Sequence, residues 1–358
     1  MKIRKRNILI YYRIFICIFS LIVINKLTTL GDYERYINGN PMTILNEYGY
    51  NFIFNSTAST EFLVGVVRQL CLGNSIVTSI IFNFLGSLGI VYFLKSVHWN
   101  KIIYLLILFP SFSIWSSYPS KELMTVLATG FVMGNLVKIY EEKKKSKIDK
   151  ILLLLGLFIL YVYKKQYLIC ILFLIIYTNL RKKIKFNFRT ITYWVYLISI
   201  IMTLYLLREK IDTFFRTFHL HFDYGSEGTV RNIFIFREKY GFYKNMLYGM
   251  FISFFGPSLF EVKQGGLKLL SFLESSIIIG VVLYSIIKMK TKNIERLFLF
   301  FNGIFLLLLP QYPFGIFNSG SAIRYRTNLY IIFLGVFYIF ILKRFNLKKY
   351  YSRKIRDK

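Results

Sequence analysis

The sequence predicts an all-α integral membrane protein that crosses the bilayer about ten times as a single membrane domain over residues 1–358. Two observations support this prediction. Hydrophobic residues make up 55% of the chain and recur in long apolar stretches, and the Lys and Arg residues between these stretches fall mostly on alternate sides. The net charge of +30 is therefore a topology signal. We expect no nucleic-acid partner, because the basic residues lie between apolar runs and do not cluster on a soluble domain.

The predicted spans begin after a basic N-terminus, whose first apolar run has no small-residue cleavage site and is either a span or an uncleaved signal anchor. The ten spans are 8–24, 75–94, 102–117, 123–137, 151–163, 167–180, 191–207, 267–287, 297–312 and 329–342.

The basic loops set the orientation of these spans. Placing 138–150, 181–189, 288–296 and the tail 343–358 inside puts both termini in the cytoplasm, in agreement with the positive-inside rule. The three cysteines show neither zinc spacing nor an obvious disulfide pair.

Two longer segments, 25–74 and 208–266, then lie on the extracytoplasmic side. Each contains an apolar stretch of its own. The stretch 61–72 has one apolar helical face and suits a helix in the membrane interface. The stretch 245–260 is interrupted by Gly249 and Gly256-Pro257, and we expect it not to cross the membrane.

The outer membrane face carries charges that the topology rule does not require. Lys164 and Lys165 lie in a predicted turn between two short spans, where a buried ammonium group is costly without a partner. An anion site for a phosphate or diphosphate explains them, and snorkelling toward lipid headgroups is the alternative.

A second outer cation, Lys121, opens the fourth predicted span. Ser120 can cap this helix, whose N-terminus would direct backbone N–H groups at an anion. The alternative is that Lys121 and Glu122 only cap the helix and pair at the membrane surface.

A third outer group, Arg324-Tyr325-Arg326, precedes the last predicted span. Two arginines suit bidentate capture of phosphate oxygens, and the tyrosine ring can stack on a sugar. The same arginines could instead anchor the chain to lipid.

Acidic residues supply the other half of a transfer chemistry. Asp32 and Glu34 follow the first span, and one of them can act as a general base toward a sugar hydroxyl. A solvated loop start is the alternative. In the second large segment, Arg231 and Arg237 are further substrate-binding candidates on surface charge alone.

The histidines of the second large segment form a weaker candidate. His219, His221 and Asp223 alternate and would converge as metal ligands on an extended strand, but no fourth ligand is evident. We therefore predict no metal site.

These features resemble bacterial O-antigen and capsule repeat-unit polymerases of the Wzy type and, more distantly, membrane glycosyltransferases of the GT-C class. The residues that carry the resemblance are Phe109-Pro110-Ser111 through Trp115-Ser116-Ser117, Ser120-Lys121-Glu122, the basic turn Lys164-Lys165, Gly256-Pro257 and Arg324-Tyr325-Arg326.

The resemblance implies a transferase at the outer face of the bacterial inner membrane that joins repeat units carried by undecaprenyl diphosphate, without a metal or cofactor. Lys121, Lys164, Lys165, Arg324 and Arg326 would hold the diphosphate, and Asp32 or Glu34 would be the base. The implied partners are the lipid-linked glycan, membrane lipid, a chain-length regulator and a flippase.

Two other functions remain open. A GT-C transferase that uses a polyprenyl-phosphate sugar shares this chemistry and would depend more on Asp32 and Glu34. A flippase or transporter predicts charged groups near the bilayer midplane, for which Arg13 and the span amides Asn83, Asn135 and Asn302 are the nearest candidates.

Overall fold

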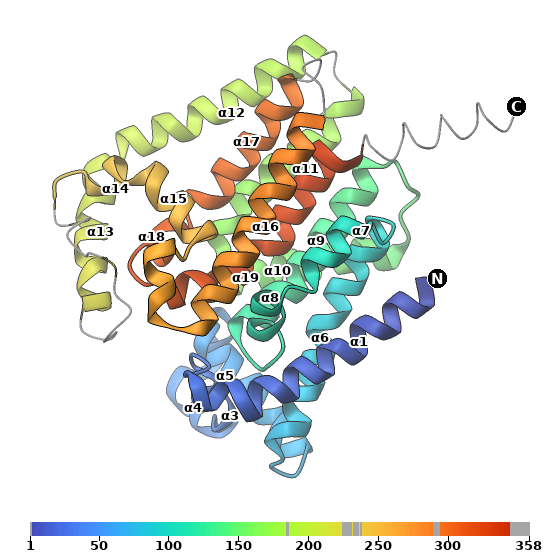
Figure 1. Cartoon of the computed structure of the whole chain (residues 1–358), viewed down its shortest axis with the longest axis vertical. Coiled ribbons are helices and arrows are strands. Elements are labelled where there is room, and N and C mark those ends of the chain that lie inside the picture. The colour runs from blue at the N-terminus through green and yellow to red at the C-terminus, as the bar shows by residue number, and fades with distance from the viewer. Residues whose placement is uncertain are drawn as a thin grey trace, which may run out of the picture. The chain divides into compact units, whose positions relative to one another are not determined.

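The described residues of the computed structural model are 2–183, 186–223, 231, 236, 238–288 and 294–343, and they form helices and turns but no β-strand (Figure 1). Six helical stretches among them are long and apolar enough to cross a membrane. They are Ile3–Leu27, Ser75–Ser96, Lys121–Tyr140, Lys147–Leu180, Gly266–Lys288 and Ser319–Leu342. The structure thus confirms the all-helical membrane class, and ten spans stay a prediction.

The chain divides into two compact units. The first unit comprises Met1–Leu168 and Thr327–Gly335, and the second comprises Ile169–Arg326 and Val336–Lys358. We describe each unit by itself.

The first unit contains the helices that follow the N-terminus up to the end of α10. They are α1 (Lys2–Phe19) with the π-helical turn η1 (Ser20–Ile24), α2 (Asn25–Leu27), α3 (Tyr33–Ile37), α4 (Pro41–Tyr48), η2 (Gly49–Phe54), α5 (Ser56–Leu70), α6 (Ser75–Ser96), α7 (Lys101–Ile107), α8 (Pro110–Trp115), α9 (Lys121–Tyr140) and α10 (Lys147–Lys164).

The predicted span 102–117 is broken into α7 and α8. Pro110 cannot continue a helix that precedes it, because it lacks a backbone N–H donor, and it starts α8 instead. The broken pair still runs along the length of α1. Tyr104 donates a hydrogen bond to the carbonyl of Lys5 near the start of α1, and Tyr12 donates to the carbonyl of Leu108 farther along.

Arg13 ties α1 to this broken span. Its side chain is wholly buried near the middle of the stretch Ile3–Leu27. The guanidinium donates to the hydroxyl of Ser116 at 2.6 Å and to the carbonyl of Ser116, with longer contacts to Ser113 and Ser87 at 3.4 Å. The buried guanidinium of Arg13 therefore holds α1 to the broken span and to α6.

Helices α6 and α9 approach each other backbone to backbone. A Cβ atom on Gly130 would lie 2.4 Å from the backbone of Gly89, and one on Gly89 would lie 2.6 Å from the carbonyl oxygen of Leu127. Such close contact of small residues is typical of helix packing in membranes, where lipid cannot drive association as water does. The pair therefore fixes the position of α9 in the first unit.

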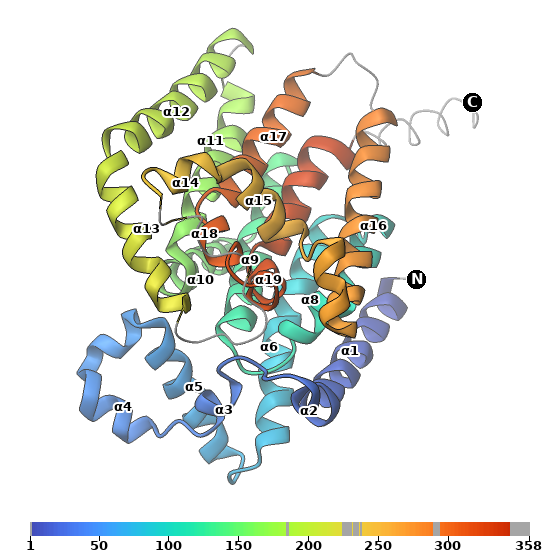
Figure 2. The same cartoon turned by 60° about the vertical axis from the view of Figure 1, so that its left-hand side comes forward.

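Helices α3, α4 and α5 gather beside the start of α6 (Figure 2). Helix α5 buries its small and polar residues, including Ser59, Thr60 and Glu61, and leaves Leu63 and Leu70 exposed. The predicted apolar face of 61–72 is thus only partly exposed, because Phe62, Val66 and Val67 are half-buried, and its place in the membrane interface stays a prediction.

The second unit begins with α11, which follows α10 after the single 3-10 turn η3 (Lys165–Tyr167). Its helices are α11 (Leu168–Lys183), α12 (Phe186–Leu206), α13 (Arg208–Asp223), α14 (Gly241–Lys244), α15 (Met246–Phe255), η5 (Leu259–Gln264), α16 (Gly266–Lys288), α17 (Ile294–Leu308), α18 (Tyr312–Gly315), and the ends of α19 (Ser319–Phe337) with η7 (Tyr338–Leu342).

Two predicted apolar segments of this unit, 245–260 and 297–312, form helices that are shorter than the segments themselves. Helix α15 has ten residues and is about 15 Å long, half of what the hydrocarbon core requires, because the chain breaks at Gly256-Pro257. Helix α17 ends at Leu308, two residues before Pro310, so the predicted span 297–312 is shorter than expected.

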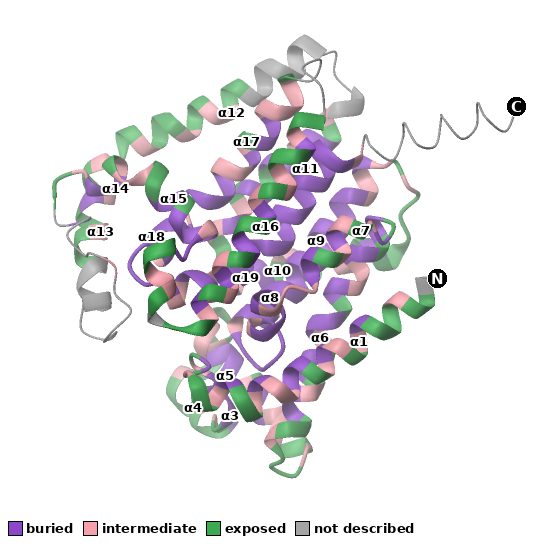
Figure 3. Cartoon of the chain, viewed as in Figure 1, coloured by how far each residue is buried: buried purple, intermediate pink, exposed green. Residues whose placement is uncertain are grey.

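Burial differs sharply between helices (Figure 3). In the candidate span Lys121–Tyr140, 89% of the most apolar 18-residue stretch is buried, against 28% in Gly266–Lys288. Helix α12 is exposed over most of its described side chains (Figure 3). Exposed apolar helices such as Gly266–Lys288 and α12 offer apolar surface to the bilayer.

Candidate functional site

The start of α9 lies against α5 in the first unit. Ser120 caps α9 by accepting a hydrogen bond from the backbone N–H of Leu123 at 3.1 Å. Next to it, the ammonium of Lys121 donates to the hydroxyl of Thr57 on α5 at 2.8 Å. The predicted cap is thus present, and the first cation of the predicted anion site is held at the N-terminus of a twenty-residue helix.

The end of α10 reaches the same helix. The hydroxyls of Tyr163 and Ser59 lie 3.1 Å apart, and Ser59 is two residues from Thr57. Lys164 follows Tyr163 and is half-buried, whereas Lys165 is exposed. The backbone angles of Lys164 are not helical, which ends α10 there. A single 3-10 turn is present at these lysines, but the two predicted spans 151–163 and 167–180 belong to one candidate span, Lys147–Leu180.

The acidic segment after the first span also reaches this region. The ring of Tyr33 contacts the ring of Tyr118 edge to face at 5.7 Å, three residues before Lys121. Asp32 is half-buried and accepts a hydrogen bond from the hydroxyl of Tyr36 at 3.2 Å, whereas Glu34 is exposed. Asp32 is therefore the better positioned of the two predicted bases.

We call Asp32, Thr57, Ser59, Lys121 and Tyr163 the α5 site, because three segments distant in sequence, at α3, α9 and α10, meet this helix. It combines a carboxylate, a fixed ammonium group and three hydroxyls. A carboxylate can accept a proton from a hydroxyl, and an ammonium beside a helix N-terminus can hold phosphate oxygens. The arrangement can therefore serve transfer from a phosphate leaving group.

Sequence reasoning missed one ion pair at this site. Arg35 on α3 pairs with Glu61 on α5, one turn after Thr57. The hydrogen bond that Arg35 donates to Glu61 raises the pKa of Arg35 above its ordinary value. The signal was present in the sequence, since Glu61 is the one acid in the segment 56–70.

Arg326, a predicted phosphate ligand, is buried in the second unit. Its guanidinium lies 3.3 Å from the carboxylate of Glu274 and donates to Ser271 at 2.9 Å and to Ser275 at 2.5 Å. The side chains of Arg326 and Glu274 are 4% and 5% exposed. These contacts favour a structural role for Arg326, because a buried ion pair leaves little positive charge to attract an anion.

Arg324 differs from Arg326 although it is only two residues away. It is half-buried, and its guanidinium lies 5.6 Å from the ring centroid of Tyr325. The Tyr325 ring in turn contacts Phe314 edge to face. Of the two predicted arginines, Arg324 is therefore the more accessible to a phosphate group.

Arg231 links two segments of the second unit through hydrogen bonds. It donates to the carboxylate of Glu261 at 2.6 Å and to the carbonyl of Gly315 at 2.7 Å. Burial opposes ionisation of Glu261, but hydrogen bonds from Arg231 and Ser258 outweigh it, so the pKa of Glu261 lies below its ordinary value. Arg231 thus has a structural role, and Arg237 lies outside the described residues.

The histidine segment is helical. Residues 219–223 belong to α13, so the extended strand on which their side chains would converge is not formed. The side chains of His219, His221 and Asp223 lie outside the described residues. Among the residues that are described, no three His, Cys, Asp or Glu side chains group as metal ligands.

Comparisons with protein-family models, with curated proteins and with solved structures find no match for this chain. The geometry of the α5 site is therefore the basis for proposing a function.

Proposed function

We propose that this protein is a membrane glycosyltransferase that polymerises oligosaccharide repeat units carried on undecaprenyl diphosphate, to form O-antigen or capsule at the outer face of the bacterial inner membrane. The observation that carries the proposal is the α5 site, where Lys121 and Tyr163 form hydrogen bonds to α5 and Asp32 precedes α3, which packs against the same helix. It supports the anion site and the base predicted from the sequence.

The proposed reaction uses these groups in one step. A sugar hydroxyl of one lipid-linked unit attacks the anomeric carbon of another, so that a glycosidic C–O bond forms and the C–O bond to the diphosphate breaks. Asp32 accepts the hydroxyl proton as general base. Lys121 and Lys164 stabilise the negative charge that develops on the departing diphosphate, because fixed cations require no rearrangement during the reaction.

The remaining predicted residues take supporting roles in this proposal. Lys165 is exposed beside Lys164 and adds a cation at the end of α10. In the second unit, Arg324 and Tyr325 are proposed as a phosphate contact and a sugar platform.

The test is deletion of the gene in its host, followed by electrophoresis of the surface polysaccharide. Complementation with Lys121→Ala or Lys164→Ala should fail to restore the ladder of chain lengths, at normal membrane levels of the protein. Lys95→Ala is the matched control, because Lys95 is an exposed lysine near the C-terminal end of α6 and should restore the ladder fully.

The pattern on the gel separates the candidate functions. Collapse of the ladder to single capped repeat units supports the polymerase. Loss of the single unit as well would assign the protein to an earlier step, as a GT-C transferase or a flippase. An unchanged ladder after deletion would refute all three.

A further inference from the structure

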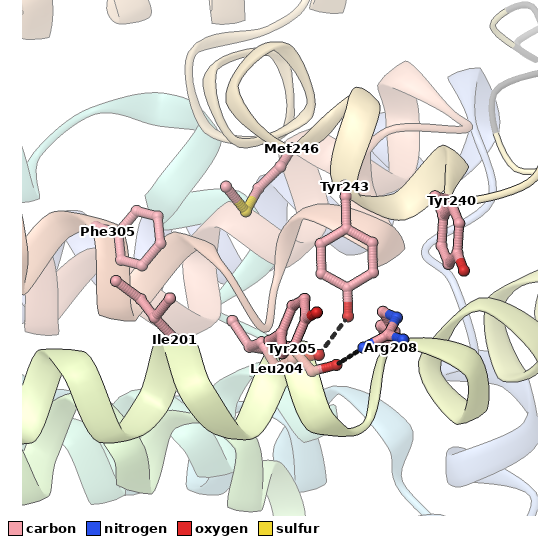
Figure 4. Close-up of a pocket in the computed structure, with 8 residues that line it drawn as sticks. All are labelled: Ile201, Leu204, Tyr205, Arg208, Tyr240, Tyr243, Met246 and Phe305. Atoms are coloured by element: carbon pink, nitrogen blue, oxygen red, sulfur yellow. Dashed lines mark hydrogen bonds between the residues drawn. The ribbon is translucent and has the colours of Figure 1, made fainter.

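A cavity of about 690 Å³ lies beside the C-terminal end of α12 in the second unit. Side chains from α12 to α17 line it, as Figure 4 shows: Ile201, Leu204, Tyr205, Arg208, Tyr240, Tyr243, Met246 and Phe305. Its volume is in the range of small-molecule and cofactor sites.

The two ends of this cavity differ in chemistry. Ile201, Met246 and Phe305 gather at one end, and Arg208 lies at the other near Tyr240 (Figure 4). Arg208 is the first residue of α13, immediately after the apolar helix Trp194–Leu206 has ended. The cavity therefore changes from apolar to cationic at the point where the sequence leaves the hydrophobic run.

The guanidinium of Arg208 is held in place by its neighbours. It lies 4.5 Å from the ring centroid of Tyr205 and donates a hydrogen bond to the Tyr205 carbonyl at 3.2 Å. Its side chain is 41% exposed. Guanidinium carries five donors, so this contact leaves the group able to bind an anion in a fixed orientation.

Glu209 is the carboxylate nearest to Arg208, at 3.9 Å, which is beyond hydrogen-bond distance. Glu209 accepts a hydrogen bond from the hydroxyl of Tyr240, and this bond lowers the pKa of Glu209. The neighbouring acids Asp212 and Glu238 are paired with Arg216 and Lys244, each at 2.9 Å. Among the described residues that line the cavity, Arg208 is the one cation.

The apolar end continues into a second cavity of about 490 Å³, which shares Ile201 and Phe305 with the first. It extends along α12 to Leu197, about 12 Å from Tyr205 at the rise of an α-helix. Its lining residues Leu247, Phe251 and Phe301 are more than half exposed. Apart from Asn302, the path is lined by apolar side chains, and it is open at its side.

We propose that these two cavities bind a polyprenyl phosphate lipid, with its phosphate at Arg208 and its first isoprene units along α12. A cation at one end of a long apolar path is complementary to a phosphate at one end of a long apolar chain. An opening at the side lets such a lipid enter from the bilayer. The choice of a polyprenyl chain over a diacyl lipid rests on the proposed function.

The test measures lipid binding to the purified full-length protein by native mass spectrometry. The probes are undecaprenyl phosphate and phosphatidylglycerol, titrated separately and in competition. We expect undecaprenyl phosphate to bind and to resist competition by phosphatidylglycerol. Arg208→Ala should weaken its binding about tenfold, because a charge-assisted contact is lost. Lys210→Ala is the matched control, since it removes the same charge two residues away outside the cavity lining, and should bind as the wild type.

A second variant tests the apolar path independently of charge. Ile201→Trp places a larger side chain where the two cavities join, and should weaken binding of undecaprenyl phosphate while the protein keeps its melting temperature. Unchanged binding in both variants would overturn the proposal, and so would equal competition by phosphatidylglycerol.

The binding assay and the polysaccharide gel test the cavity proposal and the proposed function independently. Wild-type lipid binding by Arg208→Ala, together with a ladder that collapses on gene deletion, removes the cavity proposal alone. Weakened binding by Arg208→Ala with an unchanged ladder after deletion supports the cavity and removes the polymerase.

Discussion

Arg13 in the first unit and Arg326 in the second show two ways to bury a guanidinium in a membrane-spanning stretch. Both side chains are at most 4% exposed. Arg13 is held by the hydroxyls and carbonyls of Ser87, Ser113 and Ser116, whereas Arg326 has the carboxylate of Glu274 as one partner. Neutral oxygens satisfy hydrogen bonds and leave the charge in place, whereas a carboxylate neutralises it. The two arginines should therefore respond differently to the same substitution.

The largest expected effect is that of Arg326→Met. The substitution keeps most of the side-chain volume but leaves the buried Glu274 carboxylate without its arginine, which costs about 3–5 kcal/mol. Thermal unfolding of the purified protein in detergent measures the loss. The double variant Arg326→Met/Glu274→Met should recover most of it, and a single variant as stable as the wild type would contradict the structural role.

Arg13→Met should cost less. It removes a buried charge together with its hydrogen bonds and leaves no opposite charge behind, so the loss is that of unsatisfied hydroxyls and carbonyls, about 1–3 kcal/mol. The same melting experiment measures it. A loss equal to that of Arg326→Met would break the comparison, because it would mean that the charge of Arg13 is balanced after all.

Ser116→Ala sharpens the account of Arg13. It removes the hydroxyl that accepts from Arg13 at 2.6 Å, and we expect a loss of about 1 kcal/mol. Ser117→Ala is the matched control, since the Ser117 hydroxyl donates only to the carbonyl of Ile114 among the contacts of the described residues, and its loss should be smaller. Equal losses would show that Arg13 does not depend on this hydroxyl.

The smallest effect is a dependence on pH at the second arginine–carboxylate pair, Arg231 and Glu261. Because the pKa of Glu261 is lowered in the folded protein, the pair contributes fully above the ordinary value of 4.5. The contribution falls as the pH drops from 4.5 toward the lower folded pKa. Melting curves from pH 6 downward should therefore be less steeply pH-dependent in Glu261→Gln, and identical slopes would contradict this.

The helical membrane class could be predicted because it depends on composition and on run length. The break at Lys164 and the cap at Ser120 could also be predicted, because both are local properties of the sequence. The interruption of the predicted span 102–117 follows from Pro110, which was visible but outweighed by the length of the apolar run.

The site was only partly predictable. Lys121 and Asp32 could be chosen from their types and positions, but their common approach to α5 depends on tertiary packing. Arg324 and Arg326 could not be distinguished from the sequence, because the ion pair between Arg326 and Glu274, fifty-two residues earlier, depends on tertiary packing. Arg208 could not be selected as a binding residue from the sequence either, since that role depends on the cavity beside it.

The backbone contact between Gly89 and Gly130 has a consequence for how this protein can diverge in evolution. Side chains that face lipid can exchange one apolar type for another at little cost, so most of the surface of a relative can differ. At these two positions a Cβ atom would collide with the neighbouring helix. Distant relatives should therefore keep small residues there, forty-one residues apart in this chain, after most other similarity has been lost. A set of true relatives with large side chains at both positions would show that α6 and α9 can be packed in another way.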